Sequence, residues 1–183
     1  MHIRTLMLTL AAAVALSGTT ALAGATTASA AVPTAGAQTA AATSGYHQIK
    51  NQATGQCVDA PGGRRNERLR LVDCSSATTQ KWGFTELEPG VYQLRNQHSS
   101  YCMEVNNGTS VPGEAVDQYD CSIIASSEKW VQDDFTVFGT TYARFLHQGT
   151  NLCLDTVSGR NSQLMQWTCD PEGSNGAQSW RIL

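Results

Sequence analysis

Cysteine and tryptophan recur with the same period along this 183-residue chain, and this repeat constrains the fold more than any other feature. The six cysteines fall into three successive pairs, separated by 17, 19 and 16 positions: Cys57/Cys74, Cys102/Cys121 and Cys153/Cys169. Three tryptophans follow these pairs at intervals of 48 and 50 positions: Trp82, Trp130 and Trp180. A period of this size, met three times, predicts three similar structural units.

The local pattern within each unit is that of short strands. Alternating runs such as Tyr92–Arg95 and Arg68–Leu71 are bounded by clusters of Gly, Asn, Ser and Pro. No stretch after the first 45 residues keeps apolar positions at helical spacing over three turns. Three units of about four strands each can close on one another and leave few exposed sheet edges. The sequence therefore predicts an all-β fold with threefold pseudo-symmetry.

An even number of cysteines in an exported chain is typical of disulfides. Six cysteines allow fifteen connectivities, and the repeat symmetry selects pairing within each unit. The alternative is a zinc site, which the absence of a Cys-x-x-Cys pair and of a His-x-x-x-His pair disfavours.

The first residues have the pattern of a secretory signal peptide. Arg4 precedes the apolar run Leu6–Leu16, which is shorter than the roughly 18 residues that a membrane-spanning helix needs. We expect residues 1–30 to be a signal peptide cleaved after Ala30, with cleavage after Ala23 as the alternative. The pattern predicts a secreted, extracellular protein with no membrane span.

Residues 31–45 are rich in Ala, Thr and Gly, carry no charge or aromatic side chain, and are predicted to be a disordered linker. Residues 46–183 have the length of one domain, with repeats at about 46–87, 88–136 and 137–183. The acidic residues outnumber Lys and Arg by 15 to 12, which argues against nucleic acid as a partner.

Three short motifs recur in the units and resemble those of one known family. The first is Cys57-Val58-Asp59, Cys102-Met103-Glu104 and Cys153-Leu154-Asp155. The second is Gln118-Tyr119-Asp120-Cys121 and Gln166-Trp167-Thr168-Cys169, with Leu71-Val72-Asp73-Cys74 in the first repeat. The third is Gln80-Lys81-Trp82, Glu128-Lys129-Trp130 and Gln178-Ser179-Trp180. Together they resemble the ricin B-type lectin domain, also classed as carbohydrate-binding module family 13.

The resemblance implies a β-trefoil that binds sugars through a carboxylate and an aromatic ring in each repeat. In the third repeat these are Asp155 and Trp167, with Gln178 as support, and this is expected to be the best site. The second repeat offers Glu104, Tyr119 and Asp117, where the longer carboxylate and Glu128 depart from the pattern. In the first repeat Asp59 remains, but Val72 and Arg70 stand at the aromatic and polar positions, so no stacking is expected. The residue before the closing motif, commonly Asn in the family, is Thr79, Ser127 or Ala177.

Structural roles stay open for some of these residues. Asp59 and Asp155 are also suited to accepting hydrogen bonds from backbone amides in a turn, and Tyr119 to being an exposed strand aromatic. Trp167 is flanked by the polar residues Gln166 and Thr168, which favours exposure of its ring. The ligand class that the resemblance implies is a glycan or polysaccharide, containing galactose or xylose.

The chain is not expected to be an enzyme and no cofactor is predicted, because no catalytic arrangement is recognisable in the sequence. His47, His98 and His147 are interpreted as ordinary surface or turn residues. The alternative function is protein recognition, in which a trefoil with degenerate sugar sites acts as an adaptor or inhibitor for a secreted partner.

Overall fold

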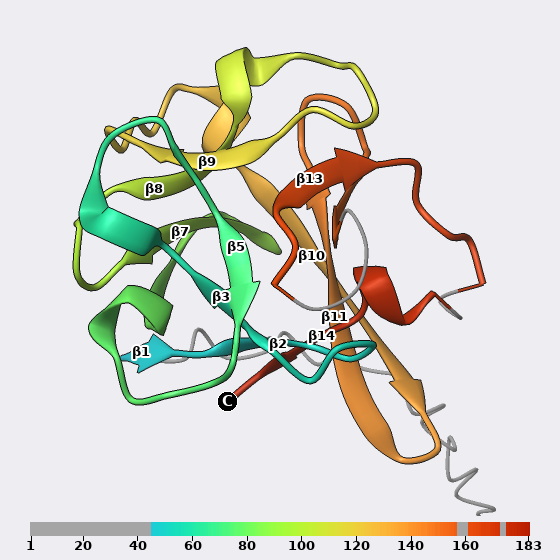
Figure 1. Ribbon diagram of the computed structural model, residues 1–183. Coiled ribbons are helices and arrows are strands. Elements are labelled where there is room, and N and C mark those ends of the chain that lie inside the picture. The colour runs from blue at the N-terminus through green and yellow to red at the C-terminus, as the bar shows by residue number, and fades with distance from the viewer. Residues whose placement is uncertain (1–44, 157–160, 173–174) are drawn as a thin grey trace, which may run out of the picture. The chain divides into compact units, whose positions relative to one another are not determined.

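The computed structural model describes residues 45–156, 161–172 and 175–183, so the predicted signal peptide and most of the predicted linker lie outside the described residues. The described chain contains strands and short 3-10 turns (Figure 1). The strands are β1 (Tyr46–His47), β2 (Ile49–Asn51), β3 (Cys57–Asp59), β4 (Glu67–Arg68), β5 (Arg70–Val72), β6 (Trp82–Glu88), β7 (Val91–Asn96), β8 (Cys102–Val105), β9 (Val116–Tyr119), β10 (Trp130–Val137), β11 (Thr140–His147), β12 (Cys153–Thr156), β13 (Leu164–Trp167) and β14 (Trp180–Ile182). The 3-10 turns are η1 (Pro61–Gly63), η2 (Thr78–Gln80), η3 (Asn106–Gly108), η4 (Ser126–Glu128) and η5 (Gly176–Gln178). Among these residues no helix is long and apolar enough to cross a membrane.

Strands from the three repeats close into a barrel. β6 pairs with β7, β7 with β10, β10 with β11, and β11 with β14. β14 pairs with β2, and the short β1 that directly precedes β2 pairs back with β6, which closes the ring. The long hairpin of β10 and β11, orange in Figure 1, is part of this ring. Among the described residues, β1 and β2 together close the ring, so its strands leave few exposed edges.

Three hairpins cover one end of the barrel: β3/β5, β8/β9 and β12/β13. They contact one another in turn, through β4 with β9, through the bridge Ala115–Met165 and through the bridge Arg70–Gln163. A barrel capped by three such hairpins is a β-trefoil, so the predicted all-β fold with threefold pseudo-symmetry is confirmed.

The three closing tryptophans occupy equivalent core positions. Trp82, Trp130 and Trp180 are fully buried, and each indole Nε1 donates to a main-chain carbonyl on the first strand of the hairpin in its own repeat: Val58 on β3 (3.1 Å), Met103 on β8 (3.1 Å) and Leu154 on β12 (3.2 Å). A buried indole needs such a partner, since an unsatisfied N–H in the core is costly. Other apolar residues around them complete one core, with Ile49, Leu71, Leu94, Phe145 and Leu164 among its largest members.

The disulfides join Cys57 to Cys74, Cys102 to Cys121, and Cys153 to Cys169, as the repeat symmetry predicts. All six cysteines are therefore bridged, and the zinc alternative is wrong. Each bridge closes a loop of similar length within one repeat, which in the chain-entropy model contributes about 3 kcal/mol.

The interpretation of His147 as a surface or turn residue is wrong. Its side chain is 1% exposed, and its ring nitrogens lie 3.0 Å from Thr150 Oγ1 and 3.0 Å from the carbonyl of Ser126. Asn51 and Asn96 hold the same place in the other repeats, and each donates to a carbonyl in or beside the 3-10 turn of the preceding repeat in the ring, Gly176 and Thr79 respectively. His147 thus replaces a structural asparagine that joins two repeats.

Candidate functional site

The strand register brings the predicted carboxylates and aromatics into equivalent places. Cys153 is opposite Trp167 and Asp155 is opposite Met165 across β12 and β13. The same register places Tyr119 opposite Cys102 and Asp117 opposite Glu104, and in the first repeat Val72 opposite Cys57 and Arg70 opposite Asp59. Because alternate residues of a strand share a face, the carboxylate and the aromatic lie diagonally on one face of the hairpin in the second and third repeats, and Asp59 and Val72 hold these places in the first.

In the third repeat the carboxylate of Asp155 is held by two donors. Its Oδ1 accepts from the backbone N–H of Thr156 (2.6 Å), and its Oδ2 accepts from Nε2 of Gln178 (2.6 Å). Burial raises the pKa of Asp155, and the hydrogen bonds from Gln178 and Thr156 oppose that rise. Each carboxylate oxygen has a second lone pair, so the group can still accept hydroxyls from a ligand.

The indole of Trp167 is 44% exposed, far more than the three core tryptophans. Gly113 from the second repeat packs against it: a Cβ at this glycine would lie 3.1 Å from Cζ3 of the ring. Its backbone N–H also donates to the carbonyl of Gln166 (2.7 Å). The ring is therefore supported on one side by a residue without a side chain and open to solvent elsewhere. The loop 157–160, between β12 and β13, lies outside the described residues.

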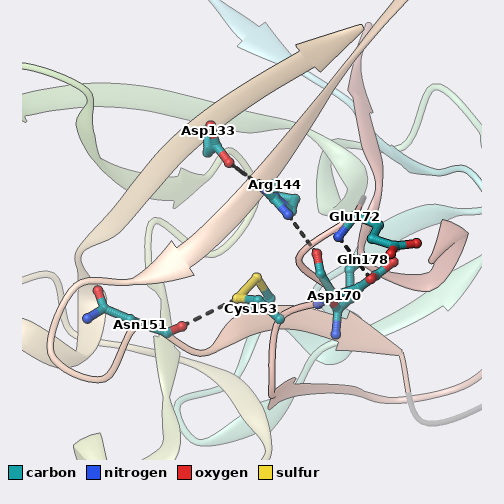
Figure 2. Close-up of polar contacts among 8 residues, drawn as sticks. Asp133, Arg144, Asn151, Cys153, Asp170, Glu172 and Gln178 are labelled. Carbon is teal, nitrogen blue, oxygen red and sulfur yellow. Dashed lines mark hydrogen bonds and ion pairs between the residues drawn. A yellow bond between two sulfur atoms is a disulfide. The ribbon is translucent and has the colours of Figure 1, made fainter. Parts of the chain in front are cut away.

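The loop after Cys169 is fixed to the barrel by polar contacts (Figure 2). Gln178 Oε1 accepts from the backbone N–H of Asp170 (2.8 Å), and Gln178 Nε2 donates also to the carbonyl of Thr168 (2.9 Å). Arg144, on β11, donates to the carbonyl of Asp170 (2.7 Å) and forms an ion pair with Asp133 on β10. The segment that carries Trp167 is thereby anchored on both sides of the disulfide.

In the first repeat the carboxylate is already occupied. Asp59 Oδ1 accepts from the hydroxyl of Thr79 (2.7 Å), and Oδ2 lies 3.7 Å from Nε of Arg70. Arg70 lies where Asp117 and Met165 lie in the other repeats. A guanidinium beside the carboxylate and a valine in place of an aromatic leave this repeat without the features of a sugar site.

The second repeat has a pocket of about 610 Å³. Its lining is mainly polar and includes Asn66, Glu104, Asn107, Tyr119, Ile124 and Ser127. Glu104 is the charged side chain of this lining, and its Oε2 accepts from the hydroxyl of Ser127 (3.2 Å). The pocket therefore presents a carboxylate among neutral hydrogen-bonding groups.

Asp117 lies opposite Glu104 on the neighbouring strand, β9, and is 3% exposed. Burial raises the pKa of Glu104 to about 7, and the nearby charge of Asp117 adds to the rise. Burial likewise raises the pKa of Asp117 to about 6. The Oδ1 atom of Asp117 is buried and has no hydrogen-bond partner among the described residues. Two adjacent carboxyls that share one proton account for both observations.

Tyr119 lines the pocket but is not a free stacking platform. The guanidinium of Arg65 lies over its ring, 4.1 Å from the centroid, and forms an ion pair with Asp120. Arg65 comes from the hairpin of the first repeat, so this contact could not be read from the second repeat's own motif. The cover of Tyr119 by Arg65 is thus a further feature of the second repeat, in addition to Glu104 and Glu128, that distinguishes it from the third.

Sequence reasoning connected the residue that precedes each closing motif with sugar affinity, through the Asn common in the family, but gave it no contact with the carboxylate. In the structure Thr79 and Ser127 donate to the carboxylates of their repeats, Asp59 and Glu104. The side chain of Ala177 cannot donate a hydrogen bond, and in the third repeat Nε2 of Gln178 donates to Asp155 instead. The signal was present as a hydroxyl residue at the same place in two repeats. In the described part of the chain, no group of three or more His, Cys, Asp or Glu side chains is arranged to hold a metal ion.

The family model described as the ricin-type β-trefoil lectin domain matches residues 45–180. No curated protein matches the sequence. Among solved structures, the designed threefold-symmetric protein ThreeFoil is 20% identical, with a TM-score of 0.68, and covers 75% of this chain and 97% of its own. An exo-β-1,3-galactanase from Clostridium thermocellum is 16% identical with a TM-score of 0.67. The lectin of Polyporus squamosus, bound to a sialylated epitope, is 13% identical with a TM-score of 0.65. The matches cover 77% and 75% of this chain but 30% and 48% of those chains, and at such identity they show the fold.

Proposed function

Because the chain belongs to the ricin-type β-trefoil lectin domain family, a family of carbohydrate-binding domains, we propose that it is a secreted carbohydrate-binding module. We assign the working site to the third repeat, at Asp155 and Trp167. The observation that carries this proposal is the indole of Trp167, 44% exposed on the same hairpin face as a carboxylate oriented by Gln178.

The two groups suit the two sides of a sugar ring. A carboxylate without a proton accepts hydroxyls from the edge of the ring, and charge assistance strengthens those bonds. An indole packs under the C–H face, where apolar contact and its electron-rich surface both favour binding. A shallow site of this kind binds weakly, so attachment to polysaccharides would gain from several ligands along one chain. Galactose- or xylose-containing glycans are the ligands we propose.

The module is proposed to be non-catalytic. Among the described residues the buried carboxyls of Asp59, Glu104 and Asp155 are engaged by neighbouring side chains or by one another. All six cysteines of the chain are in disulfides, which suits an oxidising extracellular setting.

The test compares wild type with Trp167→Ala on a glycan array and in a polysaccharide pull-down. Loss of the ring should reduce retention about tenfold or more, since stacking contributes roughly 0.5–1.5 kcal/mol beyond area burial and the buried apolar area adds to that. Phe138→Ala is the matched control, because Phe138 is a fully exposed aromatic on the β10/β11 hairpin, outside the site. Binding that survives Trp167→Ala unchanged would remove the third repeat as the site.

Protein recognition is the second candidate, and exposed apolar side chains favour it. Ile123, Ile124 and Phe138 are 70%, 87% and 104% exposed. Such side chains are costly on a surface that contacts only water. If no glycan is retained while one secreted protein co-purifies in a fixed ratio, and Ile124→Ser abolishes that association, this second function replaces the first.

A further inference from the structure

We propose that the pocket of the second repeat binds amino sugars, holding the ammonium group of the ligand against Glu104. The proposal rests on the carbohydrate-binding function proposed above, but it concerns a different repeat and a different chemical class from the neutral glycans assigned to Trp167.

The pocket carries the acidic side chain of Glu104. Glu104 is the charged side chain of its lining, and Asp117 is its cross-strand partner in the β8/β9 pair. Neither carboxyl has an ion pair with a cation among the described residues, whereas Asp59 in the equivalent place has Arg70. A buried carboxyl pair without a cation either keeps a proton or takes up a cation.

The surrounding charges do not neutralise the pair. The charged groups that act on the pair are Glu114, Arg65 and Arg68, and Glu104 in turn acts on Glu128. Arg65 is held by Asp120 and by the ring of Tyr119, and Arg68 donates to Gln163. Both nearby guanidiniums are therefore engaged by other groups, and burial, with the charge of Asp117 as a second cause, raises the pKa of Glu104.

The pocket of the second repeat differs from the third repeat in the state of its aromatic ring, Tyr119. Arg65 covers a face of Tyr119, so a neutral sugar cannot use that face for stacking. Without the stacking that supports binding in the third repeat, the principal attraction left is the carboxyl pair. A ligand that replaces the shared proton with its own ammonium group gains a charge-assisted hydrogen bond to Glu104.

The rest of the lining suits a sugar better than a simple amine. Asn66, Asn107 and Ser127 supply amide and hydroxyl groups around the carboxylate, and the volume of about 610 Å³ admits at least one sugar ring. Hydroxyls on the carbons beside the amine would find these partners.

The test is a titration of the 15N-labelled protein, followed by the backbone amide signals of Asn107, Tyr119 and Ser127. The probes are the methyl glycosides of glucosamine and galactosamine, with their N-acetyl derivatives as matched neutral ligands. We expect at least one amino glycoside to bind about tenfold or more tightly than its acetylated form, as a charge-assisted bond of roughly 1.5–3 kcal/mol implies. Glu104→Gln should remove that preference, while Asp59→Asn, the equivalent change in the first repeat, should not.

Proton release gives a second readout. Near pH 6.5 the ligand displaces a proton from the pair, so calorimetry in buffers of different ionisation enthalpy should show net proton release, which Glu104→Gln abolishes. Equal binding of amino and acetylated glycosides, or no shift at these amides with either probe, overturns the proposal. The amide signals and indole signal of Trp167, titrated with a neutral glycan in the same sample, report separately on the function proposed above.

Discussion

Gln178 donates from Nε2 to Oδ2 of Asp155 over 2.6 Å, and so joins the closing motif of the third repeat to the carboxylate of the candidate site. The equivalent Gln80 donates instead to the main-chain carbonyl of Asp73 (3.1 Å). The equivalent Glu128 has no amide group and accepts from the N–H of Ser122 (2.6 Å) and from Gln93 (2.7 Å). One position of the repeat therefore serves three different hydrogen-bond patterns, and in one of them it orients the carboxylate of the candidate site.

Gln178→Glu should destabilise the protein in a pH-dependent way. The change places a second carboxyl against the buried Asp155, and two such groups share a proton, which raises a pKa in the folded state. The folded state then binds more protons than the unfolded state, so stability is kept at acidic pH and lost as the pH rises. We expect a loss of about 2–4 kcal/mol near pH 7.5 and less near pH 4.5, from urea unfolding at both values. Gln80→Glu is the matched control, and an equal, pH-independent loss in both variants would contradict this account.

Glu128→Gln should stabilise the protein. Burial raises the pKa of Glu128, and both of its bonds from Ser122 and Gln93 reach the same oxygen, Oε2, which an amide oxygen can replace. The new Nε2 would lie where Gln80 and Gln178 donate to a main-chain carbonyl. A gain of about 1 kcal/mol near pH 7.5 is expected, smaller at acidic pH where Glu128 is protonated. A chemical denaturation series that shows a loss at neutral pH would sink the idea.

The stability of the wild-type protein should fall as the pH rises from about 4 to about 7. The pKa values of Glu104 and Asp117 are raised to about 7 and about 6, first by burial, so both groups hold protons in the folded state that the unfolded chain has released. The sign follows from linkage, and the fall should be on the order of 2 kcal/mol once solvent screening is allowed for. The double variant Glu104→Gln, Asp117→Asn should flatten the profile. Thermal unfolding followed across this range measures it, and a stability that rises over the interval would rule out the shared proton.

The repeat was predictable because its signals are local. Cysteine spacing predicted all three disulfides, and the closing tryptophans predicted the core, since covalent bridges and large apolar side chains tolerate few alternatives. The polar flanks of Trp167 favoured exposure, and the ring is 44% exposed. One of those flanks behaves differently: Gln166 is fully buried and donates to the carbonyls of Thr109 and Val111. A polar residue is buried where a neighbouring repeat supplies its hydrogen bonds.

Contacts between repeats could not be predicted from one repeat's motif. Arg65 covers Tyr119 from another hairpin, and His147 reaches Ser126 in the preceding repeat. Such contacts depend on side-chain directions at the junctions of the hairpins, which the spacing of residues along the chain does not fix. The motif predicted that the third repeat has the best site and that the first lacks stacking, but it could not predict that Arg65 of the first repeat covers Tyr119 of the second.

A sugar site should be transferable to the first repeat by two substitutions, Arg70→Met and Val72→Trp, made in the Trp167→Ala background. These residues lie opposite Asp59 and Cys57, as Met165 and Trp167 lie opposite Asp155 and Cys153, so the change copies the third repeat. Removal of Arg70 frees Oδ2 of Asp59, while the hydroxyl of Thr79 continues to orient Oδ1. We expect polysaccharide retention to return to within about tenfold of wild type, since the stacking and carboxylate contacts are both restored. Val72→Trp alone is the control, because Arg70 still occupies the carboxylate in that variant, and it should recover much less. If the pair of changes folds normally by circular dichroism and recovers no binding, a carboxylate and an exposed indole on one hairpin are insufficient to form the site.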